Sequence, residues 1–249
     1  MSTAIIIQAR SGSKRLPNKI LKPFFQEKCI LQIIIDISLK VFNNNRVIVA
    51  TTKTENDKQV VEIAKKNNIK FYCGDEEDVL SRFIEIGTKF ELKKIIRVCS
   101  DNPFLDLEGL RFLKNELISF NGDYLSFCNK KSEPTISLHY GLWAEGVTLN
   151  ALKSIKEKTS NKYFFEHVTN FLYQKNSSYR IKLFQISSTY ESSQIRLTVD
   201  TIEDFNSLKK LYFKWIHGNS IDIKSLYQII QKDKELKKIM KKEIKKNEK

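Results

Sequence analysis

A basic, hydroxyl-rich segment near the N-terminus has the residue types that hold a polyphosphate. It begins at the end of an apolar run over residues 4–9 and reads ARSGSKRLPNK over residues 9–19. Gly12 allows the backbone to approach a ligand closely, while Ser11 and Ser13 offer hydroxyl and amide donors. Positive charge comes from Arg10, Lys14, Arg15 and Lys19. The segment matches neither the P-loop nor the GxGxxG dinucleotide pattern, and a solvated basic turn is the alternative interpretation.

Two aspartates follow apolar segments at places where a carboxylate could hold a divalent cation. Asp101 follows residues 94–99 in CSDNP, and Asp200 follows residues 195–199 in LTVDT. Magnesium in nucleotide sites is commonly bound by one or two carboxylates together with substrate phosphates. Taken alone, Asp101 could instead cap the turn or helix that follows it. Beside the basic segment, the two aspartates favour a metal–phosphate site.

Other polar residues carry weaker signals. Ser81 and Arg82 lie near the start of an expected helix over residues 75–90, off its apolar stripe, and could face a ligand or water. His167 follows Glu166 in FEHVT. A lone histidine on an amphipathic helix is more often a packed, hydrogen-bonded residue than a catalyst. No Ser–His–Asp, Cys–His or HExxH arrangement is recognisable in the sequence, so covalent or zinc-dependent hydrolysis has no support.

The elements that must position these residues alternate between strands and helices in the first half of the chain. Strands are expected over residues 4–9, 46–51, 69–73 and 94–99, and helices over 29–41, 56–66, 75–90 and 107–118. Continuously apolar strands alternating with helices predict an α/β fold with a mixed, mostly parallel sheet covered by helices on both faces. In such a sheet ligands bind beyond the carboxyl ends of the strands, where the basic segment and Asp101 lie.

The second half of the chain is less regular. Strands are expected over residues 124–128, 180–187 and 195–199, helices over 162–174, 203–215 and 222–245, and a polar stretch over 129–150. No Pro/Gly/Ser-rich linker or internal repeat divides the chain. We therefore expect a single domain over residues 1–230, followed by a Lys-rich helix end or tail over 231–249 that frays.

Composition excludes several classes of protein. The 249 residues are 41% hydrophobic, and a chain of this length can bury a core without disulfides. No stretch approaches 18 apolar residues, which predicts no membrane span, and the N-terminus has no basic region or cleavage site typical of a secretory signal. The 4 cysteines are far apart and lack zinc-like spacing, which fits a reducing cytoplasm.

The net charge of +14 first suggests nucleic acid as a partner. However, nine lysines and four acidic residues fall within residues 232–249, and the remaining charge is spread along the chain. The interleaving of aromatic and basic residues that is typical of a single-strand binder is missing. We therefore expect no specific nucleic-acid partner, since a polyanionic small substrate would use the same positive field.

Six sequence segments occur in an order that identifies a likeness. They are IIIQARSGSKRLPNKIL, VIVATT, GDEEDVLSRF, IIRVCSDNPFLD, FEHVTNF and RLTVDTIEDF. Over roughly residues 4–210 the chain resembles bacterial cytidylyltransferases of the spore-coat-polysaccharide type, which are related to the CMP-sialate and CMP-Kdo synthetases. The resemblance implies a nucleotide-diphospho-sugar transferase-like, Rossmann-like fold. It also implies a reaction in which CMP from CTP is joined to an acidic sugar or other small anion and pyrophosphate is released, in surface-polysaccharide or glycoconjugate precursor synthesis.

The resemblance also implies roles for individual residues. The nucleotide would be bound by Ala9, Arg10, Ser11, Gly12, Ser13, Lys14, Arg15 and Lys19, with Ser81 and Arg82 nearby. Asp101 and Asp200 would bind Mg²⁺ and, with Arg10 and Lys19, form the catalytic set. The region ending at Glu145, together with Glu166 and His167, would face the small anionic acceptor or the partner subunit of a homodimer.

Departures from the family pattern limit what the likeness predicts. Asn18 replaces the usual glycine of Pro-Gly-Lys, and residues 26–29 replace the usual Gly-x-Pro. Because the acceptor side diverges most, the acceptor itself is not predicted. Two other functions stay open: a glycosyltransferase or nucleotidyltransferase that uses another nucleotide on the same fold, and a non-catalytic protein whose basic tail binds membrane or nucleic acid.

Overall fold

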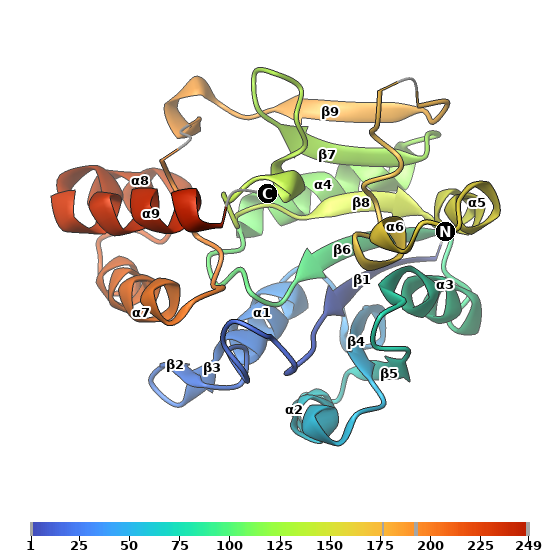
Figure 1. Ribbon diagram of the computed structural model, residues 1–249, viewed down its shortest axis with the longest axis horizontal. Helices are drawn as coiled ribbons and strands as arrows, with labels where there is room; N and C mark the ends of the chain where they lie inside the picture. Colours follow the sequence, from blue (N-terminus) through green and yellow to red (C-terminus); the bar gives the residue numbers. More distant parts are fainter. Residues whose placement is uncertain (1, 176, 192–193, 248–249) are drawn as a thin grey trace.

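A seven-stranded sheet forms the centre of the computed structural model, which describes residues 2–175, 177–191 and 194–247 (Figure 1). In spatial order its strands are β5 (Lys70–Gly74), β4 (Val47–Thr52), β1 (Thr3–Gln8), β6 (Lys94–Cys99), β8 (Glu145–Thr148), β7 (Tyr124–Cys128) and β9 (Ile181–Gln185). β8 runs antiparallel to β6 and β7, and the other neighbouring pairs are parallel. The sheet is therefore mixed and mostly parallel, as predicted.

Helices cover both faces because the strand side chains alternate between two cores. In β1, Ile5 and Ile7 belong to one cluster, and Ala4 and Ile6 to the other. The first cluster contains residues of α1 (Ile30–Leu39), α2 (Lys58–Lys66), α4 (Leu107–Ser119), α7 (Ile202–Ile216), α8 (Ile223–Lys232) and α9 (Lys234–Lys246). The second contains residues of α3 (Val79–Lys89), α5 (Leu149–Lys158) and α6 (Lys162–Glu166). This arrangement confirms the predicted fold class.

Three predicted elements are wrong in the described residues. Residues 195–199 form no strand; within this segment Leu197 N–H donates to the His139 carbonyl and Val199 N–H to the Asp101 carbonyl. The helix expected over 162–174 ends at Glu166, and Val168 takes a φ of 37° that a helix cannot contain. The helix expected over 222–245 is divided at Asp233, whose carboxylate caps α9.

Some elements were not predicted. β8 and α5 lie in the predicted polar stretch and directly after it. The sequence did not predict β8 because Glu145 and Gly146 lack the apolar, β-branched character of a typical strand. A hairpin of β2 (Pro23–Phe25) and β3 (Lys28–Cys29) precedes α1. Its Phe24 ring packs edge-on against rings of α7 at centroid distances of 5.4 and 5.5 Å, which joins the N-terminal hairpin to the C-terminal half.

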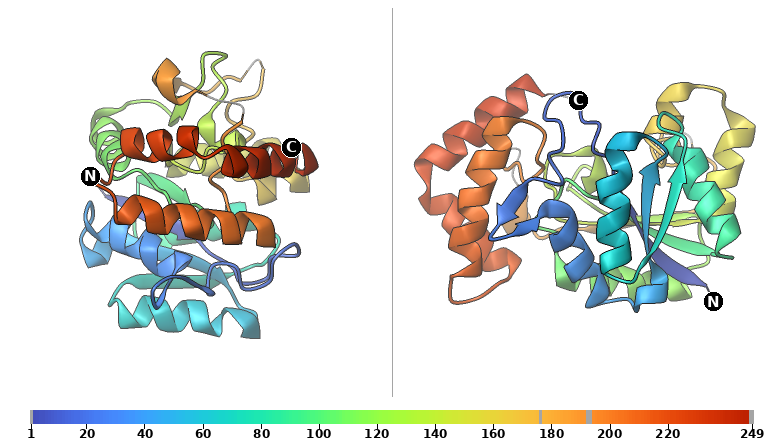
Figure 2. Two further views of the ribbon diagram at one scale, coloured as in Figure 1. Left: turned by 90° about the vertical axis from the view of Figure 1, so that its left-hand side faces the viewer. Right: turned by 90° about the horizontal axis from the view of Figure 1, so that it is seen from below.

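The C-terminal helix is part of the folded body. Figure 2 shows α7, α8 and α9 along one flank of the molecule. Leu236 and Met240 of α9 are buried in the first core cluster, and the buried Glu243 carboxylate accepts a 2.8 Å hydrogen bond from Thr201, the N-cap of α7. Asn247, which ends α9, accepts a hydrogen bond from Arg15. The prediction that the end of the chain frays is therefore wrong for residues 234–246. The division of the chain into a domain over residues 1–230 and a tail after it stays a prediction.

None of the helices in the described part of the chain is both long enough and apolar enough to cross a bilayer.

Candidate active site

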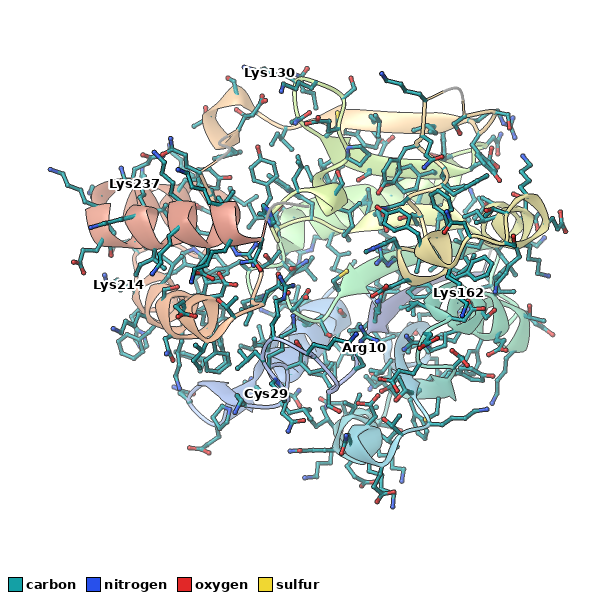
Figure 3. All side chains as sticks on the ribbon, viewed as in Figure 1. Arg10, Cys29, Lys130, Lys162, Lys214 and Lys237 are labelled. Carbon is teal, nitrogen blue, oxygen red and sulfur yellow. The ribbon has the colours of Figure 1, made fainter. Side chains whose placement is uncertain are left out.

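A cavity of about 1000 Å³ opens at the carboxyl ends of β1 and β6. It is lined by residues of the loop after β1 (10–20), the segment before α3 (75–78), the end of β6 (97–101), the segment around α6 (160–167) and Asp200. Figure 3 labels Arg10 and Lys162, which both line it. The volume is that of a nucleotide-sized ligand site. The cavity thus lies at the carboxyl ends of the strands, where the sequence predicts ligand binding.

The loop after β1 is held by Asp57, a buried residue at the start of α2. Its Oδ1 accepts hydrogen bonds from Ser11 N–H at 2.7 Å and Ser11 Oγ at 2.6 Å. Its Oδ2 accepts from Thr51 Oγ1 at 2.9 Å and from Thr52 N–H and Oγ1 at 3.1 and 2.5 Å. Burial would raise the pKa of Asp57, but these hydrogen bonds lower it below its usual value. The sequence analysis missed this residue, since an aspartate beside a helix start suggests only a cap.

The same loop accommodates the departure from Pro-Gly-Lys. Asn18 has a φ of 58°, in the left-handed region, where asparagine is tolerated better than other non-glycine residues. Its N–H donates to the Ser11 carbonyl at 2.9 Å, which closes the loop. The replacement of glycine thus keeps the loop turned back on itself.

Lys19 lies at the centre of the charged groups. Its Nζ is 3.0 Å from Asp101 Oδ2, 3.0 Å from Asp200 Oδ1 and 2.6 Å from the Val199 carbonyl oxygen. Burial by itself would lower the pKa of Lys19, but the Asp101 and Asp200 carboxylates outweigh it and raise this pKa above its usual value. Lys19 therefore carries its charge at neutral pH. The two aspartates that the sequence predicts as a pair do converge.

Asp200 is surrounded by cations. Besides Lys19, its Oδ1 lies 2.9 Å from Arg15 Nη2, and its Oδ2 lies 2.8 Å from Nη2 of the buried Arg196. Arg196 is itself fixed by two hydrogen bonds to Asp204, at 2.8 and 2.9 Å. Burial would raise the pKa of Asp200, yet these cations, Lys19 first, hold it well below its usual range. Asp200 is therefore ionised at neutral pH.

One oxygen of the carboxylate pair is open to a divalent cation whose other ligands would be substrate phosphates. Carboxylate oxygens are the donors that magnesium prefers. Oδ1 of Asp101 has no hydrogen bond within the described ranges, whereas both oxygens of Asp200 already contact cations. Among the described residues, no three His, Cys, Asp or Glu side chains are grouped so that they could hold a metal by themselves. Lys19 already supplies one positive charge between the two aspartates.

The structure brings only part of the predicted nucleotide set to the cavity wall. The predicted residues that line it are Arg10, Ser13, Lys14, Arg15 and Lys19. Ala9 and Ser11 are buried and do not line the cavity. Ser81 bonds to Asp78 at the start of α3, and Arg82 is wholly buried, with Nη2 3.4 Å from the Glu76 carbonyl oxygen. The neighbouring residues 75–78 line the cavity instead, although the sequence suggested only a helix start there.

On the predicted acceptor side, Glu166 and His167 line the cavity and Glu145 does not. The Glu166 carboxylate lies 3.7 Å from Arg10, so residues around α6 reach the basic loop. Glu145 is 0% exposed and accepts hydrogen bonds from Arg97, Tyr124 and Thr169. This placement is inconsistent with direct contact between Glu145 and an acceptor, because every face of its carboxylate is covered by protein.

Comparisons with known proteins bear on the family and the fold of the chain. A family model described as cytidylyltransferase matches residues 4–243. The spore coat polysaccharide biosynthesis protein SpsF of Bacillus subtilis is 30% identical over 84% of this chain and 85% of its own. The structure of a cytidylyltransferase from Leptospira borgpetersenii superposes with a TM-score of 0.82 at 26% identity, covering 95% of this chain and 96% of that one. CMP:2-keto-3-deoxy-manno-octonic acid synthetase complexed with CTP shares the fold, with a TM-score of 0.65 at 18% identity over 86% of this chain and 99% of that one.

Proposed function

Because this chain belongs to the cytidylyltransferase family, we propose that it transfers CMP from CTP to a small anionic acceptor, an acidic sugar or a related compound, and releases pyrophosphate. The observation that carries the proposal is the convergence of Lys19, Asp101 and Asp200 beside a basic loop in one cavity. The likeness to a spore coat polysaccharide protein supports a product used for surface-polysaccharide or glycoconjugate precursors.

The charges suit this reaction. The triphosphate of CTP repels an anionic acceptor, so its charge must be neutralised before the two can approach. Arg10, Lys14 and Arg15 line the cavity and would bind the phosphates and stabilise the leaving pyrophosphate. Lys19 holds the two aspartates in position and adds its own charge to the site. Much of the barrier to phosphoryl transfer is lowered by such positioning.

We propose Mg²⁺ as the cofactor, held by Asp101 and Asp200. When bound, the ion would neutralise phosphate charge and, for a hydroxyl acceptor, lower the pKa of that hydroxyl. Glu166 and His167 line the same cavity and are proposed to contact the acceptor. The Gly12 amide and the Ser13 hydroxyl, both in the loop after β1, are proposed to complete the phosphate contacts.

The test measures nucleotide choice and product together. The melting temperature of the protein is recorded with CTP, UTP, ATP, GTP and UDP-sugars, since a nucleotide that binds the folded state raises it. Pyrophosphate release from CTP is then assayed with Mg²⁺ and a panel of acidic sugars and phosphorylated small molecules. We expect the largest shift from CTP and acceptor-dependent pyrophosphate. A larger shift from a UDP-sugar would favour a glycosyltransferase, and no shift from any nucleotide would favour a non-catalytic protein.

A further inference from the structure

The last turns of α9 contact the surroundings of Asp200 at two points. Oε2 of Glu243 accepts a 2.8 Å hydrogen bond from Oγ1 of Thr201, the residue directly after Asp200. Oδ1 of Asn247, which ends α9, accepts a hydrogen bond from Nη1 of Arg15, a cation that pairs with Asp200. Glu243 and Asn247 are 4 residues apart, so both contacts leave α9 from the same face. The C-terminal helix thus contacts both a chain neighbour and an ionic partner of one aspartate of the site.

The Arg15 guanidinium is held through both of its terminal nitrogens. Nη1 donates to Asn247, and Nη2 lies 2.9 Å from Oδ1 of Asp200. A single contact would let this long side chain turn about that contact, whereas two contacts fix the plane of the group. The Arg15 side chain is 50% exposed, so packing alone does not fix it. The same geometry leaves further N–H donors of Arg15 for a phosphate in the cavity that it lines.

Asn247 suits this contact because its side-chain amide uses both of its ends. Nδ2 donates to the Glu243 carbonyl oxygen at 2.8 Å, and Oδ1 accepts from Arg15. A carbonyl can only accept and a guanidinium can only donate, so the two partners determine which end of the amide faces which. The side chain therefore connects α9 to the loop after β1 as well as closing the last turn of the helix.

We propose that Asn247 is a positioning residue of the active site, which holds the Arg15 guanidinium in the orientation that binds the outer phosphates of the nucleotide. This inference rests on the proposed function only in assigning the polyphosphate to CTP. Because Asn247 acts through Arg15, its effect requires a ligand that carries those outer phosphates and requires Arg15 itself. The competing explanation is that Asn247 only caps α9.

The test is a double-mutant cycle in the full-length protein. Asn247→Ala, Arg15→Gln and their combination are compared with the unchanged protein. Calorimetry in the presence of Mg²⁺ measures their affinities for CTP, inorganic tripolyphosphate and CMP.

We expect Asn247→Ala to weaken CTP and tripolyphosphate binding about fivefold, since a released arginine must be ordered again when the ligand binds. CMP binding should not change, because CMP lacks the outer phosphates. In the Arg15→Gln background, Asn247→Ala should have no further effect, since residues that act through one contact are not additive.

The matched control is Lys245→Ala, which removes an exposed charge from the last turn of α9 and should leave all three affinities unchanged. Melting temperatures show that the variants fold. Three results would overturn the proposal in favour of a helix cap: an undiminished CTP affinity in Asn247→Ala, an equal weakening of CMP binding, or a further loss in the Arg15→Gln background.

Tripolyphosphate separates the failure of this inference from that of the proposed function. Normal CTP binding by both the unchanged protein and Asn247→Ala would remove the positioning role and leave cytidylyl transfer standing. An unchanged protein that binds tripolyphosphate but not CTP, with the Asn247 effect intact, would support the positioning role and count against cytidylyl transfer. Binding of neither ligand would overturn both.

Discussion

The ammonium nitrogen of Lys19 lies 3.0 Å from Oδ1 of Asp200, although the two residues are 181 positions apart. The same nitrogen contacts Asp101 at the end of β6. One cation thus joins the loop after β1, the sheet edge and the segment that leads into α7. The geometry of the site and the packing of the N-terminal half against the C-terminal half therefore depend on the same contacts.

Replacing Lys19 should therefore affect both stability and rate. Lys19→Gln leaves two carboxylates facing each other, although Arg15 and Arg196 still contact Asp200. We expect the free energy of unfolding to fall by about 2 kcal/mol, less than for a buried pair with no other partner. We expect kcat to fall about 100-fold. Urea unfolding and pyrophosphate release measure the two effects. The control is Lys14→Gln, which changes a cavity residue that forms no ion pair in the described structure and should leave stability unchanged. A Lys19→Gln variant as stable as the unchanged protein would contradict this account.

Asp101→Asn should reduce activity with little loss of stability, because Asp101 is the partly exposed member of the pair. We expect kcat to fall about 100-fold or more and the Mg²⁺ concentration for half-maximal rate to rise. Pyrophosphate release is measured over a magnesium titration, and chelation by EDTA should abolish it in the unchanged protein. Asp36→Asn, on α1 and paired with Lys28, is the control. Near-normal turnover by Asp101→Asn would remove this residue from the mechanism.

Asp57→Asn should destabilise the protein in a pH-dependent way. The folded-state pKa of Asp57 is below its unfolded value of about 3.9, so its ionised form adds stability above that pH, and this stability is lost as the pH falls through the folded pKa. We expect the free energy of unfolding of the variant to be about 2 kcal/mol below that of the unchanged protein from pH 7 to pH 5. This difference should become smaller below pH 4. Urea unfolding across this range measures it. A loss that grows on acidification would show that another group is responsible.

Glu145→Gln tests whether this buried carboxylate is structural. The change leaves Arg97 with no carboxylate partner in the interior, and we expect the free energy of unfolding to fall by about 3 kcal/mol. The KM for an acceptor should rise far less than in His167→Ala, since Glu145 has no exposed surface. Steady-state kinetics at a temperature where both variants are folded provide the comparison. A large KM effect without loss of stability would restore Glu145 to the acceptor site.

The convergence of Lys19, Asp101 and the basic loop could be predicted because they follow strands β1 and β6. Neighbouring parallel strands end at the same edge of the sheet, so strand assignment places those side chains together. Asp200 lies in the site although the segment before it is not a strand. Two backbone hydrogen bonds, from Leu197 to His139 and from Val199 to Asp101, fix that segment instead.

Long-range partners explain what could not be predicted. Glu145 stands in a strand because Arg97 on the adjacent strand neutralises it, which no local pattern reveals. Asp57 supports the loop only because β4 runs beside β1 and carries Thr51 and Thr52 to it. The helix expected over residues 162–174 ends before Val168, which has a positive φ and is buried in the second core cluster, and neither property can be read from the local sequence.

The hydrogen bond between Arg15 and Asn247 brings the end of the chain to the rim of the cavity. An affinity tag or fusion partner added after residue 249 would emerge within a few residues of a side chain proposed to bind CTP. Thr3 begins β1 at the opposite edge of the sheet, away from the cavity. A tag on the amino-terminal side should thus leave substrate entry clear, whereas a carboxyl-terminal fusion should obstruct it.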